Sequence, residues 1–283
     1  MALCKNNSDD VRIWIDCSDS TGVLSKINNQ YDLDSLKSSI NFLNHSNNYC
    51  VSLCNFNDDS TKELNYTQFG SHLVESHCFR GYPICGSFKQ FVDTNEKYLL
   101  HLDCDMIFYE ENGYSWIQEG IRIMEENEDI LCVLPKGGPP REDGLLNQGS
   151  TTYKVDKERG LYLFKNFTSR HYLIHRERFL SLLPLEAVWL SWREPIKSKL
   201  FGNGKLLCWE TIVEKAMEKS SFWRADLMTD KAWSLHPADR SEQFYNLLPE
   251  ILDCVSRNEF PDEQKGFYDL LVNQWANFIN NKN

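Results

Sequence analysis

This chain of 283 residues contains no long apolar run. Its first residues also do not form a basic stretch followed by an apolar one. No stretch approaches the roughly 20 apolar residues with which a helix crosses a bilayer. The first residues do not resemble a secretory signal. We therefore expect a cytoplasmic protein without a transmembrane segment, for which peripheral contact with a membrane stays open.

Basic residues are also in short supply. The chain has 30 Lys and Arg against 41 Asp and Glu, which gives a formal net charge of −11. Because nucleic acids are bound through clustered Lys and Arg, this balance argues against a nucleic-acid partner. A small anion can still bind to an acidic protein where a metal ion supplies the positive charge.

Cysteine pairs with metal-ligand spacing are absent as well. The ten cysteines are scattered along the chain and form no CxxC pair, so we do not expect a zinc site. In a cytoplasmic chain of this length they are interpreted as small, buried apolar residues.

Segments of strand composition alternate with segments of helical periodicity along most of the chain. Strands are expected at residues 11–16, 49–56, 98–102, 130–135, 161–167 and 170–175, with a short one in AWSL before His236. Helices are expected near 33–43 and at 84–95, 114–126, 176–183, 209–219, 241–256 and 262–280. This alternation predicts an α/β fold in which a mostly parallel sheet is flanked by helices, with helices at the C-terminal end.

The stretch YLLHLDCDMIF, residues 98–108, carries an Asp-x-Asp (DXD) motif and the most specific functional signal. Its apolar strand leads into Asp103 and Asp105, and such carboxylates need a partner when they are buried. Strand alternation would point both to one side, with Cys104 turned away, so that they converge on one divalent ion and its diphosphate ligand. A simple turn explains the same residues, but ligands in open α/β sheets collect at the carboxyl ends of strands.

His236 is a candidate third ligand. It follows the short strand in AWSLHP, and Pro237 stiffens the backbone behind it. Two carboxylates and one imidazole would give Mn²⁺ or Mg²⁺ a mixed protein shell. The alternative is a hydrogen-bonded structural histidine.

Two further sites carry candidate general bases. Glu210 opens the helix expected at 209–219, where the helix dipole favours a carboxylate in any case. Glu142 and Asp143 lie in the Pro/Gly loop KGGPPREDG and compete for the same role, their structural alternative being a solvated loop tip.

Three more residues are candidates for binding a nucleotide. Asp16 and Asp19 end the first expected strand and could hold a nucleoside, although turn capping explains them nearly as well. Arg170, at the start of a later strand, could contact a phosphate, with a surface ion pair as the alternative.

Five segments in this order resemble a bacterial glycosyltransferase of the GT-A type, akin to the broad family two. They are YLLHLDCDM, SWIQEGIRIMEENEDI, GGPPREDGLLNQ, FTSRHYLIHRERF and WSLHPADRSEQFYNLLPEIL, and they cover roughly residues 80–270. The resemblance implies one GT-A-like, Rossmann-like domain over residues 1–283. Its nucleotide-sugar-binding half would span about 11–135, and its acceptor-side half, with the C-terminal helices, about 136–283.

The resemblance also implies roles for individual residues. Asp105 would be the direct ligand of the divalent metal, Asp103 its partner toward ribose or metal, and His236 a further ligand of the same ion. Glu210 is similar to the acidic residue that serves as base in inverting members.

We therefore expect a metal-dependent enzyme that moves a sugar from a nucleoside-diphosphate donor to a hydroxyl of a saccharide or another acceptor. A sugar nucleotidyltransferase uses a similar sheet and metal site, but residues 16–30 lack its Gly-rich phosphate loop. A non-catalytic protein that binds a saccharide or a partner is the third alternative. This alternative stays open because only about ten polar residues precede VRIWID. Either VRIWID is itself the opening strand, or the chain lacks a βα unit and its donor site is weakened.

Overall fold

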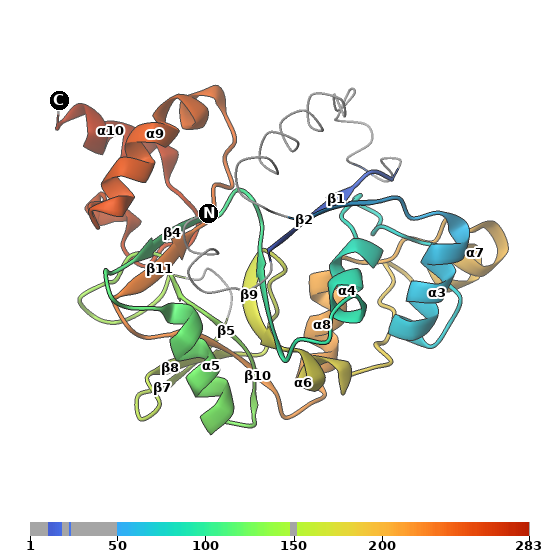
Figure 1. Ribbon diagram of the computed structural model, residues 1–283. Helices are drawn as coiled ribbons and strands as arrows, with labels where there is room; N and C mark the ends of the chain where they lie inside the picture. The colour runs from blue at the N-terminus through green and yellow to red at the C-terminus, as the bar shows by residue number, and fades with distance from the viewer. Residues whose placement is uncertain (1–10, 19–22, 24–49, 148–151, 283) are drawn as a thin grey trace. The chain divides into compact units, whose positions relative to one another are not determined.

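The computed structural model describes residues 11–18, 23, 50–147 and 152–282 (Figure 1). The chain divides into two compact units, each built from two separate stretches. Unit 1 consists of Met1–Glu96 and Phe179–Ser220, and unit 2 consists of Lys97–Arg178 and Ser221–Asn283. The single domain over residues 1–283 with halves at about 11–135 and 136–283, which the resemblance implies, stays a prediction.

Unit 1 contains a parallel strand pair and several helices. The pair is β1 (Arg12–Asp16) with β2 (Cys50–Cys54). The helices are α3 (Asp58–Phe69), α4 (Cys85–Val92), α7 (Glu194–Phe201) and α8 (Trp209–Glu218). The short α6 (Arg176–Leu180) crosses the boundary between the units. The helix expected near 33–43 lies outside the described residues.

An aromatic cluster joins the two stretches of unit 1. Phe91 of α4 stacks on Phe179, with ring centroids 3.9 Å apart, and lies 5.9 Å from the ring of Trp209 in α8. Phe88 packs beside Phe179 at 6.5 Å. All four side chains are buried. Because Phe88 and Phe91 come from the first stretch and the other two from the second, this core needs both stretches.

The main sheet of unit 2 is mixed. Its strand order is β3 (Tyr98–Leu102), β9 (His171–His175), β5 (Ile130–Leu134), β10 (Trp223–Leu227), β8 (Leu161–Phe164) and β7 (Lys154–Asp156). Only the pair of β5 and β10 is parallel among these neighbours. The prediction of a mostly parallel sheet is therefore wrong. The reason is β9, a fully buried strand that runs antiparallel between β3 and β5.

Helix α5 (Trp116–Glu126) covers this sheet at β5 and β9. Ser115 caps its start by accepting a hydrogen bond from the Gln118 N–H. A Cβ added at Gly120 would lie 2.9 Å from Leu173 of β9 and 3.2 Å from Val133 of β5. Glycine at this position therefore lets the helix backbone approach the sheet closely.

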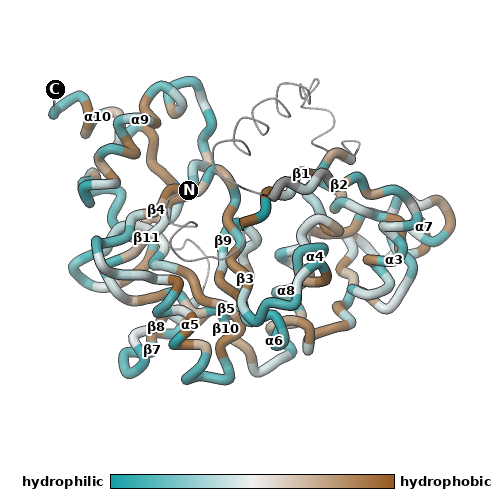
Figure 2. The backbone as a smooth tube through the Cα atoms, in the orientation of Figure 1, coloured by the Kyte–Doolittle hydropathy of each residue, from teal (hydrophilic) through white to brown (hydrophobic). Residues whose placement is uncertain are grey.

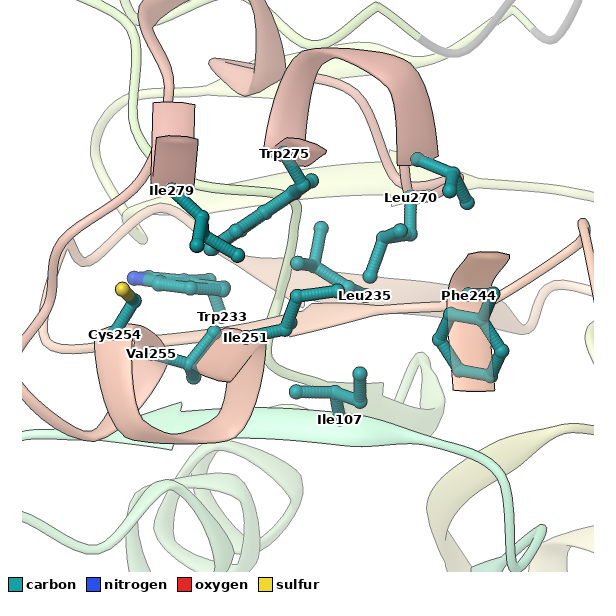
Figure 3. Close-up of a cluster of buried hydrophobic side chains, with 11 residues drawn as sticks. Ile107, Trp233, Leu235, Phe244, Ile251, Cys254, Val255, Leu270, Trp275 and Ile279 are labelled. Atoms are coloured by element: carbon teal, nitrogen blue, oxygen red, sulfur yellow. The ribbon is translucent and has the colours of Figure 1, made fainter. Parts of the chain in front are cut away.

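A smaller sheet supports the C-terminal helices. Its order is β4 (Ile107–Glu110), β11 (Ala232–Leu235) and β6 (Lys136–Gly137). The helices are α9 (Glu242–Ser256) and α10 (Val272–Asn280), with the 3-10 turn η2 (Asp262–Gln264) between them. Figure 3 shows the core that they share with the sheet, where Ile107, Trp233 and Leu235 meet side chains such as Ile251 and Trp275. The expected C-terminal helices are confirmed, although the second begins at Val272 rather than 262.

Among the described residues, no helix combines the length and the apolar character needed to span a bilayer.

Candidate functional site

The Asp-x-Asp motif lies immediately after β3, as expected. The Asp103 N–H donates to the carbonyl of Arg170 at 2.6 Å, and the Met106 N–H donates back to the carbonyl of Asp103 at 3.2 Å. Residues 103–106 therefore form a turn instead of extending the strand. Asp103, Cys104 and Asp105 all line one cavity at this turn.

The cavity at this turn has a volume of about 330 Å³. Arg240 and Tyr245 line it together with the residues of the motif. The guanidinium of Arg240 forms an ion pair with Oδ2 of Asp105. The other oxygen of Asp105, Oδ1, is buried and has no hydrogen-bond partner among the described residues. Since a buried carboxylate oxygen without a partner is costly, this atom is suited to accept a cation or a donor group.

Asp103 is the more open of the two carboxylates. Its side chain is 41% exposed, against 23% for Asp105. Its Oδ1 lies 3.2 Å from Nε2 of His101, a residue of β3 itself. Asp103 is thus accessible from solvent, whereas Asp105 is held by Arg240.

Arg240 was not identified from the sequence. It follows His236 by four residues within the segment WSLHPADRS, and a basic residue beside a candidate ligand is the only signal that could have suggested it. Its contact with Asp105 joins positions 135 residues apart.

His236 is nine-tenths buried and has an oriented imidazole ring. Its Nδ1 lies 2.9 Å from Oδ1 of Asp269, and its Nε2 is buried without a partner among the described residues. The hydrogen bond with His236 lowers the pKa of Asp269. When Nδ1 donates to Asp269, Nε2 carries the lone pair that a metal ion or a donor group would need.

A row of aromatic rings links His236 with the Asp-x-Asp turn. The ring of Tyr268 lies between those of His236 and His171, with centroids 5.8 Å from each. Its hydroxyl contacts Sδ of Met106 at 3.6 Å and Nδ1 of His171 at 3.4 Å. His236 is therefore connected to the motif through Tyr268 and Met106.

A preformed three-ligand metal centre is not found in the part of the chain that the structure describes. The two carboxylates of the turn, one with a buried and unsatisfied oxygen, fit a divalent ion by their chemistry. His236 is suitable by its own environment, but it does not form a cluster with Asp103 and Asp105.

Arg170 belongs to the same neighbourhood. Its carbonyl accepts from the Asp103 N–H, which ties the start of β9 to the end of β3. After the hydrogen bond from His236, the positive charge of Arg170 also helps to lower the pKa of Asp269.

Asp143 is bound to a neighbouring arginine. Its carboxylate accepts from Nε and from an Nη of Arg141, at 3.0 and 2.5 Å, and from the Leu145 N–H at 2.9 Å. The hydrogen bond from Arg141 lowers the pKa of Asp143, which makes it a weaker base. Glu142 beside it is exposed. The loop packs tightly on the chain that leads to Asp269, because a Cβ on Gly138 would lie 2.3 Å from the Phe267 carbonyl oxygen.

The remaining candidates lie in unit 1, or outside the described residues. Asp16 ends β1, where its Oδ2 lies 3.0 Å from Nε2 of His77. Burial opposes ionisation of Asp16, but hydrogen bonds from His77 and Ser18 outweigh it and lower the pKa. Glu210 lies in the first turn of α8 and is half-buried. Asp19 falls outside the described residues.

Neither a scan against protein-family models nor a search of curated proteins gives a match for this chain.

Proposed function

We propose that this protein is a metal-dependent glycosyltransferase with a GT-A-like fold, which transfers a sugar from a nucleoside-diphosphate donor to a hydroxyl acceptor. The observation that carries the proposal is the end of β3. There Asp103 and Asp105 line one cavity, and Asp105 retains a buried oxygen without a partner. A carboxylate pair in this position is what a metal-bound diphosphate requires.

The neighbouring strands support the proposal. β3 and β5 run in the same direction on either side of β9, so their carboxyl ends lie at the same edge of the sheet. The small sheet ends at His236, whose ring Asp269 orients. A divalent cation held by Asp103 and Asp105 would supply positive charge against the negative charge that develops on the departing diphosphate.

Arg240 has a defined role within this proposal. Its guanidinium compensates the charge of Asp105 and competes with any other cation for Oδ2. The side chain is 55% exposed, so it can leave Asp105 at a low cost in desolvation. Arginine also binds phosphate oxygens in bidentate fashion, and the released guanidinium would be close to a diphosphate in the cavity.

Of the two candidate proton acceptors for the attacking hydroxyl, Glu210 belongs to unit 1 and stays a prediction from the sequence. Asp143 belongs to unit 2, where its ion pair with Arg141 and its lowered pKa weaken it as a base. A carboxylate that is already stabilised as an anion accepts a proton less readily.

The test is metal binding and donor turnover in Asp105→Asn. Mn²⁺ binding, followed by electron paramagnetic resonance, is measured with a panel of nucleoside-diphosphate sugars, and donor hydrolysis is measured in parallel. We expect the wild-type protein to bind Mn²⁺ and the variant to lose about tenfold in affinity. Turnover should fall by about a hundredfold or more, as for other groups that stabilise developing charge.

Asp253→Asn is the matched control. Asp253 also pairs with an arginine, Arg257, but on the exposed side of α9. This variant should behave as the wild type does. Unchanged Mn²⁺ affinity and turnover in Asp105→Asn would overturn the proposal. Consumption of a nucleoside triphosphate and a sugar phosphate with release of pyrophosphate would instead identify a nucleotidyltransferase.

A further inference from the structure

Large apolar side chains are concentrated on the surface around α7. Trp192, Leu200 and Phe201 are 74%, 67% and 73% exposed, and Ile196 is 53% exposed. Single exposed apolar residues are ordinary on protein surfaces, but a cluster of this kind indicates a site of interaction. We call these four residues the α7 patch. In Figure 2 the tube at α7 is partly brown, in keeping with its hydrophobic composition.

In α7 the usual polarity of a surface helix is reversed, because polar residues lie on its buried side and apolar residues on its exposed side. Glu194 and Ser198 are each only 5% exposed. The Ser198 hydroxyl donates to Glu75 at 2.8 Å, and the Gly204 N–H donates to the same carboxylate at 2.9 Å. The Glu194 carboxylate accepts from the Lys205 N–H at 3.1 Å.

These buried hydrogen bonds fix which side of α7 faces outward. Positions 192, 196 and 200 are spaced by four residues, so Ile196 and Leu200 share one helix face, and Trp192 precedes them by the same spacing. Turning this face inward would break the hydrogen bond from Ser198 to Glu75 and the one from the Lys205 N–H to Glu194, although Glu194 would keep its ion pair with Lys197. The apolar exposure is therefore built into the fold.

Basic residues surround the patch. Residues 190–205 contain four basic residues and one acidic residue, a local net charge of +3 in a chain of −11. The basic residues are Arg193, Lys197, Lys199 and Lys205, all of them exposed. The guanidinium of Arg193 lies over the ring of Trp192, 5.1 Å from its centroid.

We infer that the α7 patch inserts into the interface of an anionic lipid bilayer, with the surrounding basic side chains on the lipid phosphates. Tryptophan, phenylalanine and leucine beside lysine and arginine are typical of helices that lie in this interface. Anionic headgroups complement the local positive charge. A second copy of the chain fits less well, because the two patches would bring like charges together. The inference is independent of the proposed function.

Sedimentation of the full-length protein with lipid vesicles tests the inference. Vesicles of phosphatidylcholine alone are compared with vesicles in which about one third of the lipid is phosphatidylglycerol. We expect binding to the anionic vesicles, weaker binding to the neutral ones, and loss of binding as salt is raised. The double variant Leu200→Ser/Phe201→Ser should bind at least about tenfold more weakly, since two large apolar side chains no longer enter the interface.

The control is a second double variant, Leu252→Ser/Val155→Ser. It removes exposed apolar side chains, 47% and 41% exposed, that lie elsewhere. This variant should bind as the wild type does. Circular dichroism spectra should be the same for all three proteins, because every altered side chain is exposed.

Three results would overturn the inference. They are full binding by Leu200→Ser/Phe201→Ser, an equal loss in the control, and no binding of the wild type to anionic vesicles. A change of the wild-type sedimentation coefficient with protein concentration, abolished by Leu200→Ser/Phe201→Ser and without vesicle binding, would assign the α7 patch to self-association instead.

Discussion

Asp105 shows which residue-scale features a sequence can reveal. The end of the strand before Asp103 is confirmed, because a run of apolar residues that meets two carboxylates is a local signal. Arg240 could not be predicted in the same way. Its contact depends on the packing of α9 and β11 around β4, and no local pattern records which of 30 basic side chains will face a given carboxylate.

His171 offers a residue-scale prediction about pH. Its ring is buried in β9, with Nε2 3.1 Å from the Ser234 hydroxyl, and burial lowers its pKa to about 3. In the unfolded chain the same group takes up a proton near pH 6.5. The folded protein is therefore fully stabilised by this residue above about pH 6.5, and loses stability as the pH falls toward 3.

Urea unfolding at pH 7 and pH 5 measures this effect. Between these values His171 should lower the free energy of unfolding of the wild type by up to about 2 kcal/mol, and His171→Gln should lack this loss. His72→Gln, at an exposed position, should keep the wild-type dependence. The same pH dependence in His171→Gln and the wild type would show that the buried imidazole is not its source.

At the scale of elements, existence and type were predictable where the apolar pattern is strong. The strands β1, β2, β3, β5, β8 and β9 and the helices α4, α5, α8 and α9 lie where the sequence predicts them, within a few residues at their ends. Helix α3 was missed because it is largely polar, and its clearest local signals are the caps Asn57 and Gly70. Strand directions were also missed, because a fully buried strand has the same composition whether its neighbours are parallel or antiparallel.

The loop after β6 gives a prediction at this scale. Gly138 has a φ of 90°, and a Cβ there would lie 2.3 Å from the carbonyl oxygen of Phe267. Gly144 in the same loop has a φ of 67° with nothing within 4 Å of the added atom. Gly144→Ala should cost about 1 kcal/mol from backbone strain alone, and Gly138→Ala at least about 2 kcal/mol more, because the carbonyl of Phe267 must move.

Urea denaturation of the two glycine variants, followed by far-ultraviolet circular dichroism, provides the comparison. Both variants replace glycine by alanine at a position of positive φ. The difference between their free energies of unfolding therefore isolates the close approach of the backbone at Gly138. Equal midpoints for the two would contradict the packing of this loop against residues 264–267.

At the scale of the whole molecule, the division into discontinuous units could not be read from the sequence. A flexible linker between domains can be recognised by its composition. Here the chain leaves unit 1 after residue 96 and returns to it at residue 179 without such a linker. The boundary at 178 and 179 even falls within α6.

This organisation predicts which truncated chains can complete unit 1. A chain ending at residue 178 lacks Phe179 and Trp209, so Phe88 and Phe91 lose their partners. Amide hydrogens of α4 should then exchange rapidly, whereas in a chain ending at residue 220 they should be protected. Hydrogen exchange read by mass spectrometry makes the comparison, and equal protection in both chains would show that the first stretch folds alone.

The same aromatic cluster has a consequence for biosynthesis. Residues 97–220 must be translated before the first 96 can finish folding, which takes about 6 to 25 s at typical elongation rates. During that interval Phe88 and Phe91 of the nascent polypeptide lack the aromatic side chains of Phe179 and Trp209 that pack on them in the folded protein. Slower elongation over residues 97–220 would lengthen the time for which these two rings stay unpacked, and faster elongation would shorten it.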